Sequence, residues 1–139
     1  MKYMIMLYAS QRDYDEMAGR APAGEAVWSA ADLAAMYAFM EEFNRELVES
    51  GEFVDANALA APVHTRRFHS RDGVPVVTDG PYPETAEVLA GYTIIECDGF
   101  DRASEITARL ARCPAPPGAE ARAVADLRPL VDGRADLEA

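Results

Sequence analysis

The chain has 139 residues, of which half are hydrophobic and 27% are charged. This is the size and composition of one globular domain, so we expect a single domain over residues 1–139 and exclude a wholly disordered chain. The formal net charge of −11, from 13 basic and 24 acidic residues, excludes the basic face of a nucleic-acid-binding protein and disfavours anionic membrane surfaces.

The first expected elements are a strand and a long loop. Residues 2–9 place apolar side chains on both faces, which predicts a central strand covered on both sides. Residues 10–28 are mostly polar and contain two glycines and a proline, so we expect a long loop with at most one short helical turn. Trp28 ends this loop, either as a hydrophobic plug or as part of a pocket wall.

The clearest helix covers residues 30–50. Its apolar side chains recur at steps of three and four and form one stripe, which comprises Leu33, Met36, Tyr37, Met40, Phe43 and Leu47. Ser29 with Asp32 three residues later resembles a capping box at the start of the helix. Gly51 stands where a C-terminal glycine belongs.

A hairpin is expected in the middle of the chain. Residues 52–60 are read as a second strand, and Pro62 then interrupts the chain. Residues 63–70 and 74–78 form the two arms of a hairpin, because an Asp-Gly pair at 72–73 lies between them. In this interpretation His64 shares a strand face with Arg66 and Phe68, and His69 lies on the opposite face.

The second half of the chain repeats the pattern of strand and helix. We expect a tight Asp-Gly-Pro turn at 79–81, a single helical turn at 83–87 and a strong strand at 91–97. A helix over 102–112 follows, with Asp101 as its N-cap. A last strand over about 122–130 and a loose tail from about 131 complete the chain.

This order predicts an α+β fold, a ferredoxin-like sandwich of the type β-α-β-hairpin-β-α-β. Both helices cover one face of the sheet. The other face carries either Tyr3, Ile5 and Leu7 or the alternate side chains of the first strand, and it needs a cover. We therefore predict a two-fold homodimer that packs sheet against sheet.

The ends of the chain and the cysteines favour a cytoplasmic protein. The apolar start is too short for a secretory signal, and no stretch reaches the roughly 18 apolar residues that a membrane span needs. Cys97 and Cys113 lack the spacing of a metal site, so we expect two reduced, mostly buried thiols.

Several separated motifs together resemble one family. Residues 76–95 contain a strand, Asp-Gly-Pro-Tyr, a short acidic turn and Gly-Tyr at the start of another strand. The Met-Lys-Tyr-Met-Ile-Met-Leu start, Phe43-Asn44, Arg112-Cys113-Pro114 and Arg128-Pro129 agree in order and spacing. The sequence thus resembles the DGPF-type, YCII-related family over most of its length.

The resemblance implies a dimeric α/β barrel of ferredoxin-like subunits. Some relatives are encoded with extracytoplasmic-function sigma factors, and a few YCII-type relatives are cofactor-free lyases or dehalogenases of small aromatic compounds that use a His–Asp pair. The histidine of that pair has no counterpart here, because the first helix contains no histidine. Asp79 matches the aspartate of the Asp-Gly-Pro motif, and Gly80, Pro81, Gly91 and Tyr92 also match their motif positions.

The candidate functional residues gather around the Asp-Gly-Pro turn. Asp79, Glu84 and Glu87 are carboxylates that could act as acid and base, or Asp79 caps the turn while the glutamates are solvated. His64 beside Arg66 suits a small acidic aromatic ligand, although both histidines are also read as solvated hairpin residues.

Tyrosines are the remaining candidates. Tyr82 and Tyr92 flank the acidic turn and could close a pocket, and Tyr8 is a further candidate for ligand binding, although aromatics at strand spacing also fill cores. Asp79, Glu84, Glu87 and His64 lack the usual spacing of a metal site, so we predict no metal. Motifs for nucleotide cofactors, phosphate-binding loops and nucleophilic serines are absent, and we predict no cofactor.

Two functions remain open. The first is a small cofactor-free enzyme, or enzyme-like domain, that binds a small polar or aromatic molecule, with Asp79 and His64 as catalytic residues. Its binding residues are Arg66, Tyr82, Glu84, Glu87, Tyr92 and Tyr8. The second is a non-catalytic regulatory or binding module associated with an extracytoplasmic-function sigma factor, since the acidic surface suits a basic partner.

Overall fold

A four-stranded antiparallel sheet forms the centre of the computed structural model, which describes residues 1–20, 28–80, 82–119 and 124–137. Its strands lie in the order β2-β5-β1-β6, with β1 at Lys2–Ala9, β2 at Phe53–Ala58, β5 at Val88–Glu96 and β6 at Ala125–Pro129. β1 pairs with β5 on one side and with β6 on the other, so the predicted central position of the first strand is confirmed.

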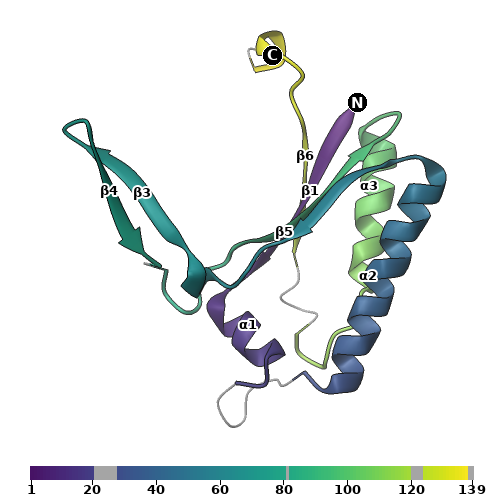
Figure 1. The fold of residues 1–139 in the computed structure, drawn as a ribbon. Coiled ribbons are helices and arrows are strands. Elements are labelled where there is room, and N and C mark those ends of the chain that lie inside the picture. The colour runs from purple at the N-terminus through teal and green to yellow at the C-terminus, as the bar shows by residue number, and fades with distance from the viewer. Residues whose placement is uncertain (21–27, 81, 120–123, 138–139) are drawn as a thin grey trace.

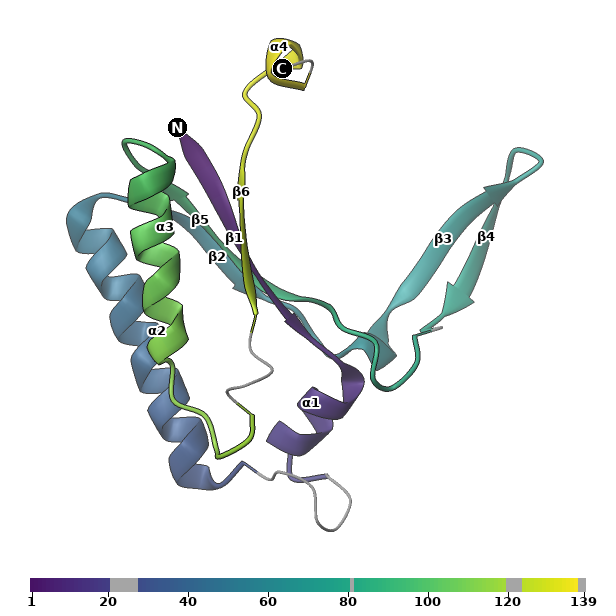
Figure 2. The same ribbon diagram turned by 180° about the vertical axis from the view of Figure 1, so that it is seen from behind.

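Two helices cover one face of this sheet. α2 (Ala30–Ser50) and α3 (Phe100–Ala108) lie side by side on that face, and a short 3₁₀ helix, η2 (Arg109–Arg112), follows α3 (Figures 1 and 2). The buried core lies between these helices and the sheet and comprises Tyr3, Ile5, Phe43, Leu47, Ile95, Ala103 and Ile106. The expected α+β class is therefore confirmed, with a sheet that does not close into a barrel within one chain.

α2 has the predicted bounds and the predicted caps. The Asp32 backbone N–H donates to Ser29 Oγ over 3.0 Å, and the Ser29 N–H donates to Asp32 Oδ2 over 2.9 Å. This reciprocal pair satisfies backbone donors that the first helical turn leaves without partners. Gly51 ends the helix with a φ of 78°, a left-handed conformation that glycine adopts without steric cost.

The predicted hairpin is present and stands apart from the main sheet. β3 (Arg66–Arg71) and β4 (Val74–Asp79) form a separate two-stranded sheet, and it projects from the side of the main sheet opposite to α2 and α3 (Figure 1). Asp72 and Gly73 at its tip both have positive φ values, 52° and 79°, as a type I′ turn requires. Almost every residue of the two arms is exposed.

The first loop differs from the expectation. Residues Gln11–Met17 form a helix, α1, instead of a loop with one short turn. A second capping box starts it, in which the Ser10 N–H donates to Asp13 Oδ2 over 2.8 Å and Ser10 Oγ accepts from the Asp13 N–H. The remainder of the expected loop at 21–27 lies outside the described residues.

The chain before the hairpin also differs. Residues Pro62–His64 form a 3₁₀ helix, η1, so the strand expected from residue 63 begins only at Arg66. Proline favours the first turn of a helix because it has no N–H to leave unpaired. His64 therefore does not share a strand face with Arg66 and Phe68.

Further corrections concern the second half of the chain. Residues 83–87 form a turn closed by the bond from the Ala86 N–H to the Pro83 carbonyl, 3.0 Å, instead of a helical turn. α3 begins at Phe100, with Gly99 as its N-cap, so Asp101 is not the cap but lies in the first turn. There its carboxylate still favours the positive end of the helix.

The last expected elements lie partly outside the described residues. The expected strand over 122–130 corresponds to β6, and residues 120–123 lie outside the described part of the chain. Pro81 of the Asp-Gly-Pro turn and residues 138–139 of the tail also lie outside it. The described part of the tail includes a four-residue helix, α4 (Arg134–Leu137), whose residues are exposed. Among the described residues, no helix combines the length and apolarity needed to cross a bilayer.

Candidate functional site

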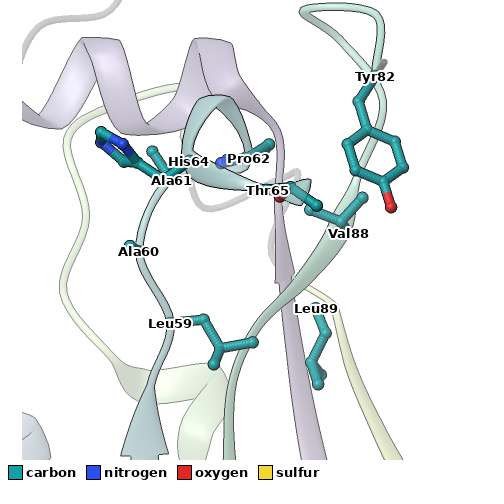
Figure 3. Close-up of a pocket in the computed structure, with 9 residues that line it drawn as sticks. All are labelled: Leu59, Ala60, Ala61, Pro62, His64, Thr65, Tyr82, Val88 and Leu89. Carbon is teal, nitrogen blue, oxygen red and sulfur yellow. The ribbon is translucent and has the colours of Figure 1, made fainter. Parts of the chain in front are cut away.

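An open cleft of about 400 Å³ lies at the base of the hairpin. We call it the hairpin-base cleft, and it is lined by Leu59, Ala60, Ala61, Pro62, His64, Thr65, Tyr82, Val88 and Leu89 (Figure 3). Its walls come from the segment between β2 and β3, from Tyr82 and from the first two residues of β5. The cleft therefore combines apolar side chains with an imidazole, a hydroxyl and a phenol.

Hydrogen bonds to α1 and β5 hold the segment before the hairpin in place. The Tyr14 hydroxyl donates to the Leu59 carbonyl over 2.8 Å, and Gln11 Oε1 accepts from the Val63 N–H over 2.9 Å. The Leu59 N–H donates to the Ala90 carbonyl of β5 over 2.7 Å. Pro62 of this segment is buried, and together these contacts fix one wall of the cleft.

His64 and Tyr82 lie at opposite ends of the cleft. Figure 3 shows the imidazole of His64 on one side and the ring of Tyr82 on the other, with Thr65 and Val88 between them. The guanidinium of Arg67 stacks over the Tyr82 ring, with Cζ 4.8 Å from the ring centroid, and this cation–π contact restrains the phenol. A ligand that touches both polar groups must therefore extend along the cleft.

Asp79 lies beside the cleft and does not line it. It is paired with Arg66 at the base of the hairpin, and the Gly80 N–H donates to the Thr65 carbonyl over 2.8 Å. Both side chains are exposed, and no ion pair joins them among the described residues. Arg66 directly follows the lining residue Thr65, and Asp79 lies opposite Arg66 in the hairpin, so both flank the cleft.

The two candidate glutamates occupy different surroundings. A second hollow, of about 150 Å³, shares Tyr82 and Pro62 with the hairpin-base cleft and is also lined by Gly80 and Glu84. The Glu84 carbonyl accepts from the Arg12 N–H over 3.0 Å, which attaches the acidic turn to α1. Glu87 is exposed and lines neither hollow. Among the described residues, which include Asp79, Glu84, Glu87 and His64, no three His, Cys, Asp or Glu side chains form a group that could hold a metal ion.

Tyr92 and Tyr8 lie away from this cleft. The Tyr92 hydroxyl donates to Asp55 Oδ2 over 3.2 Å and accepts from Asn57 Nδ2 over 2.9 Å. Tyr8 lies near Asp126, and the hydrogen bond to that carboxylate, more than burial, raises the pKa of the Tyr8 phenol. The structure therefore places Asp79, His64, Arg66, Tyr82 and Glu84 near the hairpin base and places these two tyrosines elsewhere.

Several residues of the site carry no motif in the sequence. Leu59, Val88 and Leu89 supply the apolar wall, and Arg67 restrains Tyr82. Arg67 has one usable sequence signal, because it alternates with Arg66 and so must face the other side of the hairpin. The apolar wall has no local signal, since Leu59 meets β5 only through long-range pairing.

The arrangement can bind and polarise a small molecule. Imidazole transfers protons near neutral pH, and a phenol or hydroxyl donates hydrogen bonds to a ligand oxygen. The apolar wall would cover the flat face of a ring, and openness to solvent would let a small ligand enter without a large rearrangement. The chemistry that these groups offer is acid–base chemistry.

Comparison with known proteins identifies relatives of the chain. The chain matches the family model of the YCII-related domain over residues 1–128. It is also similar to an uncharacterized protein of Rhizobium meliloti (strain 1021), with 27% identity over 103 residues, which cover 73% of this chain and 83% of that protein. The match extends from the first strand almost to the end of β6 and spans the hairpin-base cleft. The chain therefore belongs to the YCII-related domain family.

Proposed function

We propose that this YCII-related protein binds a small polar or aromatic molecule in the hairpin-base cleft and acts on it by cofactor-free acid–base chemistry. The observation that carries the proposal is the presence of His64, Thr65 and Tyr82 along one cleft with an apolar wall. In an aqueous cleft of this kind, a histidine can accept a proton from the ligand and return it at another position.

The other candidate groups take supporting roles in this proposal. Tyr82 orients the ligand through its hydroxyl, and Arg67 keeps the Tyr82 ring in place. Asp79 and Arg66 lie at the margin, where a carboxylate and a guanidinium would favour opposite charges on the ligand. Glu84 lines the adjoining smaller hollow and adds negative charge there, and Glu87 is an exposed residue directly before β5. The proposal leaves out Tyr92 and Tyr8, because they lie elsewhere.

A turnover and binding assay tests this function. We expect at least one compound from a panel of small phenols and lactones to bind or to be converted by the wild-type protein. His64→Gln should abolish conversion, because it removes the group that moves the proton, and Asp79→Asn should lower it, because it removes a negative charge at the margin of the cleft. His69→Gln is the matched control, since His69 is an exposed residue of β3 that lines neither hollow at the hairpin base. Equal activity of His64→Gln and wild type would overturn the proposal.

The regulatory alternative makes the opposite prediction. A sigma-factor partner would co-purify with the protein and would be released by charge reversal on the acidic surface, while His64→Gln would have no effect. Co-purification of such a factor, together with a panel in which nothing binds, would replace the enzymatic proposal by this one.

We further propose that the protein works as a cytoplasmic homodimer of ferredoxin-like subunits. The strand order β2-β5-β1-β6 with two helices on one face supports the ferredoxin-like arrangement. Ile5 is fully buried in the core under the helices, so its neighbours Met4 and Met6 point to the opposite, open face. That face also carries Ile94, which pairs with Met4.

Burial of the open sheet face would favour the binding of a second copy of the chain. A standard interface covers about 800 Å² per partner, and an apolar centre of this kind supplies much of the driving force. Met6→Lys should therefore convert the dimer into monomer or aggregate, whereas Val48→Lys, on an exposed part of α2, should leave the dimer intact. A mass of 15.1 kDa for the wild type by light scattering at micromolar concentration would be that of one chain and would contradict the proposed dimer.

A further inference from the structure

The hairpin of β3 and β4 stands away from the core, and we call its residues 66–79 the hairpin arm. The arm is a two-stranded sheet of its own, in which β3 and β4 pair only with each other among the described strands. Almost all of its residues are exposed. A two-stranded hairpin by itself is only marginally stable in water, and packing against another surface stabilises it. The arm would therefore gain stability from a partner that covers it.

One face of the hairpin arm carries exposed apolar side chains. Phe68 lies directly opposite Val77, and Pro75 lies two residues before Val77 on the same face. Phe68 is 68% exposed and Val77 is 50% exposed. Covering such a pair removes apolar area from water, which favours association. This face thus has the composition of the apolar centre of a protein interface.

The opposite face of the hairpin arm is basic. Arg67, His69 and Arg71 alternate with the other residues of β3 and share this face. The β4 residues opposite them are two valines and a threonine, so the face carries no carboxylate. The whole chain has 24 acidic and 13 basic residues, so its excess of acidic residues lies outside the arm. A second copy of the chain is therefore a partner of complementary charge for the arm.

The direction of the hairpin arm also points to a second copy. The arm projects from the side of the main sheet that α2 and α3 leave open (Figures 1 and 2). Met4, Met6 and Ile94 point to the same side, and the proposed dimer covers them. A second copy packed on this sheet face lies on the side to which the arm extends. By two-fold symmetry, each arm then flanks the other copy.

From the exposed apolar pair, the basic face and the direction of the arm, we infer that the hairpin arm clasps the second copy of the chain. Phe68 and Val77 pack against the surface of that copy. The arm is only two strands wide, so the long side chain of Arg71 reaches past its edge to carboxylates at the rim of the contact. The inference rests on the proposed homodimer and assigns the arm the role of strengthening it.

Photo-crosslinking tests the contact directly in the full-length protein. Phe68 is replaced by p-benzoylphenylalanine, an aromatic residue that bonds covalently to neighbouring groups under ultraviolet light. Tyr37 receives the same replacement as the matched control, because it is an aromatic residue on α2 that is 63% exposed. We expect illumination to give a product of twice the chain mass from the Phe68 variant and none from the Tyr37 variant.

Charge substitutions measure how strongly the arm contributes to the dimer. Phe68→Asp should raise the dimer Kd about ten-fold, as loss of a central aromatic contact does. Arg71→Glu should raise it by a smaller factor, and this effect should shrink in about 1 M salt, which screens exposed charges. Arg112→Glu makes the same change in net charge on η2, beside the helix layer, and should match wild type at both salt concentrations. Circular dichroism establishes that each variant is folded.

The outcomes separate this inference from the dimer itself. The inference would be overturned, and the dimer would stand, if Met6→Lys disrupts a wild-type dimer that Phe68→Asp and Arg71→Glu leave unchanged. Equal crosslinking from residues 37 and 68 would also overturn it, because random collisions would explain both products. A monomeric wild type would overturn the inference together with the dimer. If Phe68→Asp does not fold, the crosslink and Arg71→Glu decide.

Discussion

Replacing Glu52 by Gln removes one half of a bidentate ion pair that joins the start of β2 to α3. Arg102 Nε donates to Glu52 Oε2 over 2.9 Å, and Arg102 Nη2 donates to Glu52 Oε1 over 2.8 Å. The Glu52 side chain is 14% exposed and that of Arg102 is 36% exposed. These hydrogen bonds lower the pKa of Glu52 from its ordinary value of 4.5 to about 2. The pair links segments 50 residues apart, so its loss should destabilise the fold.

The pKa sets both the size of the effect and its direction with pH. The full shift would correspond to an upper limit of about 3.4 kcal/mol, at about 1.4 kcal/mol per pH unit. Water screens the partly exposed Arg102, so we expect Glu52→Gln to lower the free energy of unfolding by about 1–2 kcal/mol at pH 7. Because the pKa is lower in the folded state, this contribution is present above about pH 4.5 and is lost as the pH falls toward 2.

Urea denaturation of wild type and variants at pH 7 and at pH 3 provides the measurement. The difference between wild type and Glu52→Gln should be smaller at pH 3. Glu105→Gln is the matched control, because Glu105 contacts the same Arg102 over 3.1 Å but its side chain is 69% exposed, and we expect it to cost less than about 0.5 kcal/mol. Equal losses in the two variants, or a Glu52→Gln loss that grows on acidification, would refute the reasoning.

Two further substitutions test the packing and capping of α2 by the same denaturation assay. Leu47→Ala should lower the free energy of unfolding by about 2–5 kcal/mol, because Leu47 is fully buried. Val48→Ala, at a residue that is 61% exposed, should change it by no more than about 0.5 kcal/mol. Similar values for the two variants would contradict the described core. Gly51→Ala should cost about 1 kcal/mol because the position has a φ of 78°, and Gly133→Ala, with open space around it, should cost nothing measurable.

The sequence predicts those elements whose signals are local. The bounds of α2 follow from its apolar stripe and from the caps at Ser29 and Gly51, and the hairpin tip follows from Asp72 and Gly73, because each signal comes from residues close together in the chain. α1 was missed as a helix because residues 11–17 lack an apolar stripe, although Ser10 with Asp13 carried a capping signal. A helix this short gains most of its stability from tertiary contacts, such as the hydrogen bond from Tyr14 to the Leu59 carbonyl, and no local pattern predicts these contacts.

The candidate site was predictable only in part, because it depends on contacts between distant segments. Asp79 of the Asp-Gly-Pro motif lies at the base of the hairpin, beside the hairpin-base cleft. The strand interpretation placed His64 beside Arg66, but Pro62 starts a 3₁₀ helix that carries His64 to the cleft instead. Tyr92 follows Tyr82 closely in sequence, yet the strand β5 carries it to Asp55 and Asn57. Neither outcome can be read from spacing, since His64 depends on the 3₁₀ helix after Ala61 and Tyr92 depends on how β5 pairs with β2.

The most direct measurement of the proposed function is an NMR titration of the two histidine side chains. His64 and His69 are the only histidines, so their imidazole signals can be assigned with one variant each. On addition of a phenol or lactone that binds, the imidazole signals of His64 should shift, while those of His69 should remain unchanged. Binding that leaves the His64 signals unchanged would contradict the assignment of the hairpin-base cleft as the functional site.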